Sequence, residues 1–259
     1  MAEQEKVHHN INYLKKEAQN LALRQKITLG ASPLKKLGPL LQESHDILND
    51  AYRELVRAVK QKRELSTAAE WFVDNYYIIQ EQFVEVEEDL PPSYYKKLPR
   101  LLKGEYRGLP RIYELIQLLA TVNDNVIDKE NTIDAVQAFQ EEEALKIGEL
   151  WAIPIMIRLV LLLRLTDKIE ELKKFRLMRR KIDELLDEIQ QHENREPGFL
   201  LRQLSDMAYE QPSDERYLCL LAQRLQARGM LTDSERQWFD YKFSQWNTTL
   251  EGEMRQEAQ

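Results

Sequence analysis

The chain has 259 residues, 43% of them hydrophobic, with 37 Lys or Arg against 44 Asp or Glu and a formal net charge of −7. This length can bury a substantial core, and the single cysteine, Cys219, cannot form an internal disulfide, so a disulfide-stapled mini-protein is excluded. The acidic balance argues against nucleic acid as a partner, because binding to a phosphate backbone needs a clustered basic surface.

Apolar residues recur at steps of three and four along almost the whole chain, while the alternation typical of strands is nearly absent. This pattern predicts an all-α fold, a multi-helix domain of amphipathic helices with short connectors. Residues 67–70 have capping-box spacing, and Pro91 and Pro92 stop the helix that begins there. Pro154 is expected in the first turn of its helix, and Gly148 marks either a close helix contact or the joint before it. The predicted helices, in chain order, span residues 5–28, 39–62, 67–89, 110–122, 132–144, 151–165, 165–190, 199–209, 213–228 and 232–246.

The longest helical pattern covers residues 165–190, where apolar positions step by three or four between charges. It predicts one long helix or the arm of a helical hairpin. The stretch before it, 151–165, is shorter than the roughly 20 residues that a membrane helix needs, and it contains Arg158 and Arg164. We expect a buried core helix there and no membrane span in the chain.

The C-terminal part has clear helix boundaries, because Gly229 suits a C-cap and residues 232–235 repeat the capping-box spacing. We predict N-terminal helices in 1–64, a helical core in 65–165, and the long helix with the C-terminal helices in 166–259, all packed as one domain. The N-terminus lacks a basic region followed by an apolar stretch, so we expect a cytoplasmic protein.

The residue types that ordinarily carry chemistry show no recognised arrangement. None of the four histidines, His8, His9, His45 and His192, is spaced with other ligands in a metal motif. Cys219 stands among leucines, a setting typical of packing. The sequence has neither a Gly-rich phosphate loop nor a nucleophile elbow. We therefore expect no catalytic residue, no metal site and no cofactor in this chain.

Residues 69–82 depart from generic helix composition, because they mix an aromatic ring with amide and carboxylate groups. One helical face collects, at spacings of three and four, Trp71, Asp74, Asn75, Ile78 and Gln82. Such a face can stack on a sugar ring and hydrogen-bond its hydroxyls, or it can join helices through a buried polar network. The residues alone favour the buried network.

Residues 147–158 form a second unusual segment, because Glu149 and Arg158 are charged positions in an otherwise apolar helix. A buried charge is costly unless it is paired, so both side chains need partners. Asp74 and Glu81 are the candidate partners of Arg158. We therefore predict a cross-helix network that links the two unusual segments.

A series of short motifs runs through residues 65–165. In order, the motifs are Ala69-Glu70-Trp71 with Asp74-Asn75 and Glu81-Gln82, Asp89-Leu90-Pro91-Pro92 with Tyr94-Tyr95, Leu98-Pro99, Gly108-Leu109-Pro110-Arg111-Ile112-Tyr113, and Gly148-Glu149-Leu150-Trp151-Ala152-Ile153-Pro154-Ile155-Met156-Ile157-Arg158. Together they resemble the N-terminal region of cyclic β-1,2-glucan synthases, large bacterial enzymes that polymerise glucose from UDP-glucose and then cyclise the product. The run at 250–259 resembles the opening of the next motif of that family.

The resemblance implies that the chain is an N-terminal helical piece of a much longer synthase, anchored in the inner membrane, whose catalytic residues lie downstream. It implies a non-catalytic role: docking onto the transferase portion or guiding the growing glucan. The implied partners are the downstream domains and β-1,2-glucan. The candidate residues for glucan contact or for a structural network are Trp71, Asp74, Asn75, Glu81, Gln82, Tyr94, Tyr95, Arg111, Tyr113, Glu149, Trp151 and Arg158.

Two alternatives stay open. One is a free-standing helical scaffold that acts by self-association or partner binding through residues 165–190, whose heptad-like spacing is typical of such contacts. The other is an independent glycoside-active enzyme that uses the carboxylates around Glu81 and Glu149. Retaining chemistry would need two carboxyl groups about 5–5.5 Å apart and inverting chemistry about 6.5–9.5 Å.

Overall fold

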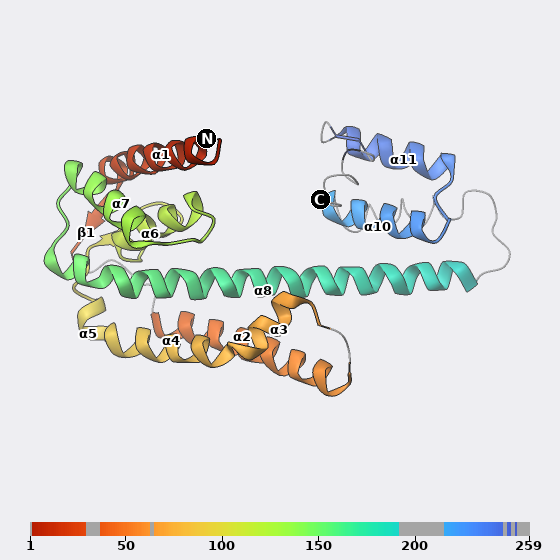
Figure 1. Ribbon diagram of the computed structural model, residues 1–259, viewed down its shortest axis with the longest axis horizontal. Coiled ribbons are helices and arrows are strands. Elements are labelled where there is room, and N and C mark those ends of the chain that lie inside the picture. Colours follow the sequence, from red (N-terminus) through yellow and green to blue (C-terminus); the bar gives the residue numbers. More distant parts are fainter. Residues whose placement is uncertain are drawn as a thin grey trace. The chain divides into compact units, whose positions relative to one another are not determined.

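The computed structural model describes residues 2–29, 37–62, 65–191, 215–245, 248–249 and 252. This part of the chain is mostly helical (Figure 1), which confirms the predicted all-α class. The chain divides into two compact units, Met1–Glu170 and Glu171–Gln259, and helix α8 (Ile147–Gln191) runs through the point of division. The three-part division expected from the sequence stays a prediction.

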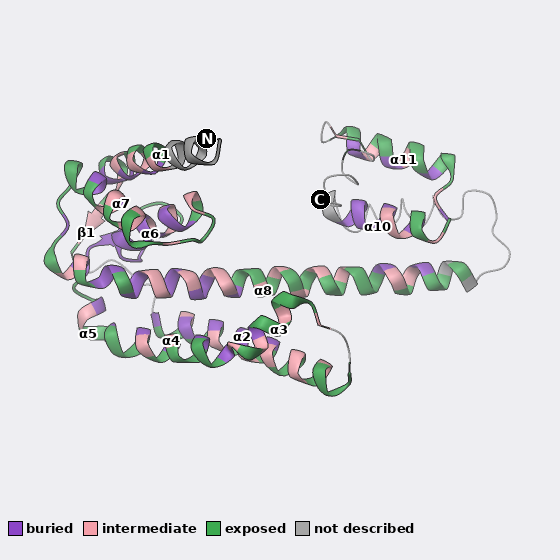
Figure 2. Ribbon diagram, viewed as in Figure 1, coloured by how far each residue is buried: buried purple, intermediate pink, exposed green. Residues whose placement is uncertain are grey.

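The first unit contains the helices α1 (Ala2–Arg24), α2 (Leu37–Lys60), α3 (Thr67–Asp74), α4 (Tyr76–Asp89), α5 (Pro92–Tyr95), α6 (Arg111–Val122), α7 (Lys129–Glu142) and the first part of α8. Helix α1 packs on α6 and α7, α2 packs on α3 and α4, and α6 packs on α7. Their buried positions, purple in Figure 2, belong to one hydrophobic cluster that includes Leu21, Phe83, Leu115, Phe139 and Leu159.

A two-stranded antiparallel sheet, which the sequence pattern did not predict, follows α1. Strand β1 (Ile27–Thr28) pairs with β2 (Arg100–Leu101), so the helix predicted over 5–28 ends at Arg24 instead. Two-residue strands are too short to show an alternating pattern, and only the long-range pairing defines them. The sheet ties the end of α1 to the connector that leads into α6.

The helix predicted over 67–89 is broken at Asn75, which has φ −107° and ψ 9° and separates α3 from α4. The side-chain amide of Asn75 donates to the carbonyl oxygen of Trp71 at 2.8 Å, and the Asn75 backbone N–H donates to the same oxygen at 3.0 Å. The backbone bond is the last of the regular ladder of α3, and the side-chain bond offers the same carbonyl a second, local donor at the break. The cap also differs, since Ser66 rather than Thr67 accepts the N–H of Ala69. The predicted face from Trp71 to Gln82 therefore does not lie on one continuous helix.

Helix α8 has 45 residues without interruption, so residues 165–190 belong to one long helix rather than to a hairpin arm. Figure 1 shows it as one continuous coil. Pro154 lies inside this helix and not in its first turn, which corrects the sequence expectation. Proline is tolerated at the cost of one helical hydrogen bond, because its nitrogen has no hydrogen to donate.

The second unit packs the last part of α8 against α10 (Glu215–Ala227) and α11 (Asp233–Ser244). Ile182 and Leu186 of α8 are fully buried in this core, and Cys219 is buried and in no disulfide, as its apolar neighbours predict. The predicted C-cap and capping box are confirmed: Gly229 has φ +64°, and the Thr232 N–H donates to a Glu235 carboxylate oxygen at 3.1 Å. The helix predicted over 199–209 lies outside the described residues.

Tyr76 offers a test of the junction between α3 and α4. Its ring stacks on Tyr52 at a centroid distance of 4.3 Å, and its buried hydroxyl has no hydrogen-bond partner among the described residues. Burial raises the pKa of Tyr76 to about 12, above the value of about 10 of an unfolded chain. The contribution of Tyr76 to the free energy of unfolding is therefore fully present below pH 10. It is lost as the pH rises toward 12, because the unfolded state releases this proton first.

We expect Tyr76→Phe to leave the free energy of unfolding at neutral pH unchanged or to raise it by up to about 1 kcal/mol, because it removes an unpaired buried hydroxyl. The loss of stability at alkaline pH should also become smaller. Urea unfolding followed by circular dichroism at neutral and alkaline pH measures both effects. The exposed Tyr77→Phe is the matched control and should change neither quantity. A strongly destabilised Tyr76→Phe would show that the hydroxyl has a partner.

Candidate functional site

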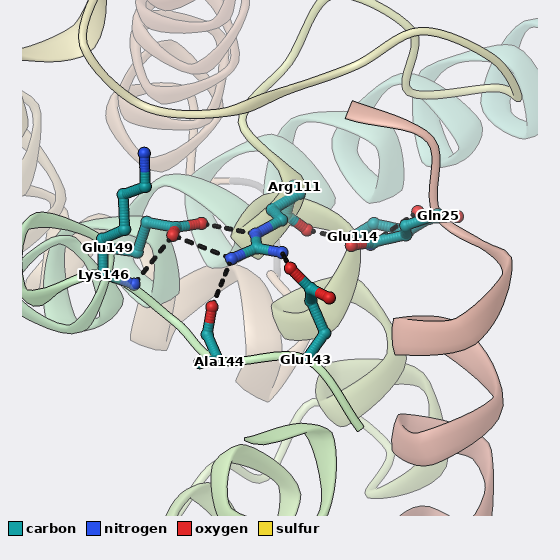
Figure 3. A network of polar contacts seen from close by, with 7 residues as sticks. All are labelled: Gln25, Arg111, Glu114, Glu143, Ala144, Lys146 and Glu149. Atoms are coloured by element: carbon teal, nitrogen blue, oxygen red, sulfur yellow. Dashed lines mark hydrogen bonds and ion pairs between the residues drawn. The ribbon is translucent and has the colours of Figure 1, made fainter. Parts of the chain in front are cut away.

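The polar centre of the first unit is a buried ion pair between Arg111 and Glu149 (Figure 3). Arg111 Nε donates to Glu149 Oε1 at 2.6 Å, and Arg111 Nη2 donates to Glu149 Oε2 at 3.0 Å. Only 3% of the arginine side chain and 1% of the glutamate side chain are exposed. Two parallel charge-assisted hydrogen bonds are the strongest way for a protein to pair these groups.

Local sequence places each partner at the start of a helix. Glu149 stands in the first turn of α8, where its Oε2 accepts the backbone N–H of Lys146 at 2.9 Å. This is the glutamate half of a capping box, and a carboxylate there also suits the positive end of the helix dipole. Arg111 follows Pro110 and begins α6, and its backbone N–H donates to the carbonyl of Pro99 at 2.9 Å.

The remaining groups of the Arg111 guanidinium join the pair to the end of α7. Nη2 donates to the Ala144 carbonyl at 2.8 Å, and Nη1 lies 3.5 Å from Glu143 Oε1. The guanidinium carbon also lies 5.6 Å from the centre of the Phe139 ring. One side chain therefore connects the start of α6, the segment after α7 and the start of α8.

The network reaches α1 through Gln25, which follows that helix. Its side-chain amide donates to the Arg111 carbonyl at 3.2 Å and to Glu114 Oε2 at 2.9 Å. Figure 3 shows Gln25 and Glu114 on the side of Arg111 away from Glu149. Residues from both ends of the first unit's sequence thus meet at the backbone and side chain of Arg111.

Arg158 has carboxylate partners, but not the expected ones. Its Nε lies 3.1 Å from Glu85 Oε2 and its Nη1 lies 3.5 Å from Asp89 Oδ2, so it pairs with neither Asp74 nor Glu81. The bridge does connect α8 with α4. It is half-exposed, so solvent screens it far more than the Arg111–Glu149 pair.

The first turns of α8 also present apolar side chains to solvent. Ile147 is 67% exposed and Trp151 is 69% exposed, and Pro154 is exposed as well. Spacings of four and three place the three residues on one side of the helix. Tyr94 braces the other side, because its hydroxyl donates to the Gly148 carbonyl at 2.5 Å. A Cβ at Gly148 would lie 3.7 Å from the Tyr94 ring, an ordinary packing distance, so no close helix contact requires glycine here; Gly148 stands at the start of α8.

The other candidate residues do not gather around these groups. Trp71 is 59% exposed on α3, and Asp74 and Glu81 are exposed as well. Asn75 and Gln82 are half-buried. The buried ones are aromatic: burial raises the pKa of Tyr95 to about 12 and also raises that of Tyr113, whose hydroxyl oxygen accepts from Gln117 at 2.8 Å. Of the twelve residues, Arg111 and Glu149 form the buried ion pair, Tyr95 and Tyr113 are also buried, and the others are half-buried or exposed.

A cavity of about 660 Å³ lies beside α2, α4 and α5. Apart from Glu87 and Lys96, its lining is apolar or glycine. Among its described lining residues, Tyr95 is the one that belongs to the candidate set. Glu87 and Lys96 are the charged residues among them.

Glu149, one of the two carboxylates considered for glycoside chemistry, is engaged in the buried pair. Both Glu149 oxygens accept hydrogen bonds from Arg111 or Lys146 in a buried setting, so this carboxylate is not a free acid or base. No three His, Cys, Asp or Glu side chains of the described chain form a group able to hold a metal ion. Within the same residues no helix is long and apolar enough to cross a membrane.

Fold and site together define an all-α domain whose first unit is held by a buried ion pair. No protein-family model matches the chain. The chain is 35% identical over 139 residues to the cyclic beta-(1,2)-glucan synthase NdvB of Rhizobium meliloti (strain 1021). The match covers 53% of this chain and only 5% of that protein. The resemblance expected from the motifs is thus supported for one region, without a role for it.

Sequence reasoning placed Arg111 and Glu149 in the same candidate set but did not pair them. Two signals were available: Glu149 stands in an apolar helix and needs a cation, and Arg111 directly follows Pro110 at the start of another apolar helix. Glu85 and Glu143 gave no such signal, because they lie in acidic runs typical of solvated helix faces.

We expect Glu149→Gln to lower the free energy of unfolding by about 3–5 kcal/mol, because it leaves the buried guanidinium without a counter-charge. Urea unfolding followed by far-ultraviolet circular dichroism measures this loss. Arg158→Gln, which breaks a half-exposed bridge, is the matched control and should cost less than about 1 kcal/mol. Replacing both partners, with Arg111→Met and Glu149→Leu, should restore much of the lost stability. Equal effects of Glu149→Gln and Arg158→Gln would refute a dominant buried pair.

Proposed function

We propose that this chain is a non-catalytic helical module of a protein similar to cyclic β-1,2-glucan synthase, and that it docks onto another portion of that protein. The docking surface is the strip formed by Ile147, Trp151 and Pro154, called here the Trp151 face. The exposure of this strip carries the proposal, since Ile147 and Trp151 are 67% and 69% exposed. An exposed tryptophan flanked by aliphatic side chains is typical of the centre of a protein interface.

The rigidity of the underlying helix supports this role. The Arg111–Glu149 pair and the Tyr94–Gly148 hydrogen bond both fix the turns that carry the Trp151 face. A surface that is already ordered loses little conformational entropy when a partner binds. More of the contact energy therefore remains for affinity.

The size of the matching protein supports a docking partner within the same chain. The 139 matched residues are 5% of the Rhizobium meliloti protein, so its matching region belongs to a far longer polypeptide. A helical module with an exposed apolar strip suits a structural role in such an assembly.

Guiding a glucan chain is the second candidate function. The observation that favours it is the second exposed tryptophan, Trp71, which is 59% exposed and has the exposed Asp74 one turn away. A tryptophan ring with neighbouring polar groups can stack on a sugar. The amide of Asn75, however, is engaged by the Trp71 carbonyl and contributes less to such a site.

The test of docking is calorimetric titration of this chain into Rhizobium meliloti NdvB from which the matching region has been removed. We expect saturable binding that Trp151→Ala weakens by at least about 30-fold, the effect of losing an interface hot spot. Trp71→Ala is the matched control and should leave the affinity unchanged. Both variants should keep the free energy of unfolding within about 0.5 kcal/mol, because both side chains are exposed.

A parallel titration with linear β-1,2-glucan, followed by tryptophan fluorescence, separates the two functions. Docking predicts no saturable change. Saturable glucan binding that Trp71→Ala or Trp151→Ala weakens would contradict the docking proposal and support glucan guiding. Absence of binding to the truncated NdvB, or binding that Trp151→Ala does not affect, would also contradict docking through this face.

A further inference from the structure

The second unit begins with a strongly basic part of α8. This part belongs neither to the buried Arg111–Glu149 pair nor to the Trp151 face. Residues 172–182 contain six Lys or Arg and no Asp or Glu, in a chain whose net charge is −7. We call residues 172–181 the basic stretch. Acidic residues flank this run at 170–171 and 183–184, so its positive potential is confined to the run itself.

The basic stretch has one side packed and the rest in solvent. Phe175 and Met178 pack against the core of the second unit, in line with the fully buried Ile182 one turn further. The remaining positions carry the cations, and five of the six are exposed: Lys174, Arg176, Arg179, Arg180 and Lys181. The core thus fixes which side of the helix faces outward.

Two leucines stand among these cations on the outward side. Leu172 is 56% exposed and Leu177 is 50% exposed. Arg180 shares an exposed ion pair with Glu184 at 3.4 Å, and pairs of this kind contribute little and leave the cation accessible. The exposed surface of the stretch therefore combines cations with two apolar side chains, the residue types that contact headgroups and acyl chains at a lipid–water interface.

The charge of the basic stretch and its exposed leucines together indicate which kind of partner it binds. Phosphates attract Lys and Arg whether they belong to a nucleic acid or to a lipid headgroup. A single-stranded nucleic acid is bound best where exposed aromatic rings stack on bases, but Phe175, the aromatic residue of the stretch, packs against the core. Exposed leucines gain nothing from a phosphate backbone and gain contacts at the acyl-chain boundary of a bilayer.

We propose that the basic stretch of α8 binds the surface of an anionic lipid bilayer, with its cations on the headgroups and Leu172 and Leu177 inserted at the interface. This inference is independent of docking through the Trp151 face, since it rests on a different part of α8. The helix would lie on the surface of the bilayer and would not cross it.

The test is co-sedimentation of the full chain with vesicles of phosphatidylcholine alone or of phosphatidylcholine mixed with phosphatidylglycerol. We expect binding to the anionic vesicles only, and weaker binding at high salt, because ions screen exposed charges. Each Lys or Arg near an anionic bilayer contributes about fivefold to the affinity. The triple change Lys174→Gln, Arg179→Gln and Lys181→Gln should therefore weaken binding about a hundredfold.

The matched control changes three exposed lysines of the first unit, Lys60→Gln, Lys97→Gln and Lys103→Gln, and so alters the net charge equally. It should leave the binding within a few-fold of the unchanged chain. Equal weakening by the two triple variants would overturn the proposal in favour of a general charge effect. Circular dichroism confirms that each variant is folded, as expected for exposed positions.

The leucines distinguish a lipid surface from other polyanions. Leu172→Ser with Leu177→Ser should weaken vesicle binding by about tenfold, because the apolar contact is lost. The same double variant should bind duplex DNA, used as a phosphate polymer, as the unchanged chain does. Tighter binding to DNA than to anionic vesicles, or vesicle binding that the leucine changes leave intact, would overturn the lipid assignment. Failure to bind anionic vesicles at low salt would also overturn it.

Discussion

The buried pair of Arg111 and Glu149 is the constraint on which the first unit depends. A charge in a core is tolerated only when a counter-charge and further hydrogen bonds replace the water it has lost. Arg111 meets this condition with donors to Glu149, Ala144 and Glu143, and Glu149 also accepts the N–H of Lys146. Because these groups come from the start of α6, the segment after α7 and the start of α8, satisfying one charge positions three parts of the chain.

Burial, more than residue type, decides how much each Lys or Arg contributes to folding. Arg111 is buried and rigid, Arg158 forms a half-exposed bridge from α8 to α4, and the cations of residues 172–181 face solvent. Water screens the exposed charges, so they contribute little to folding and remain available to a partner. The buried pair instead fixes the orientation of the first turns of α8 and, with it, the outward position of Trp151.

Helix α8 carries different surfaces along its length because different neighbours cover it. Near its start, Ala152 and Met156 enter the core of the first unit while Ile147 and Trp151 remain in solvent. Near its end, Ile182 and Leu186 enter the core formed with α10 and α11. The expected association side of residues 165–190 is thus partly used within the chain itself, and the described positions left exposed carry charges of both signs.

The sequence by itself determined the features that depend on residues a few positions apart. Helical periodicity, the stop at Pro91 and Pro92, and the Thr232–Glu235 capping box follow from such local spacing, as does the need of Glu149 for a cationic partner. Only the tertiary structure decided which partner each group found. The pairing of β1 with β2, the stacking of Tyr76 on Tyr52 next to the break at Asn75, and the ion-pair partners Arg111 and Glu85 all join residues far apart in the chain. Local patterns cannot encode these choices, because several chemically equivalent carboxylates were available and distance in the folded chain selected among them.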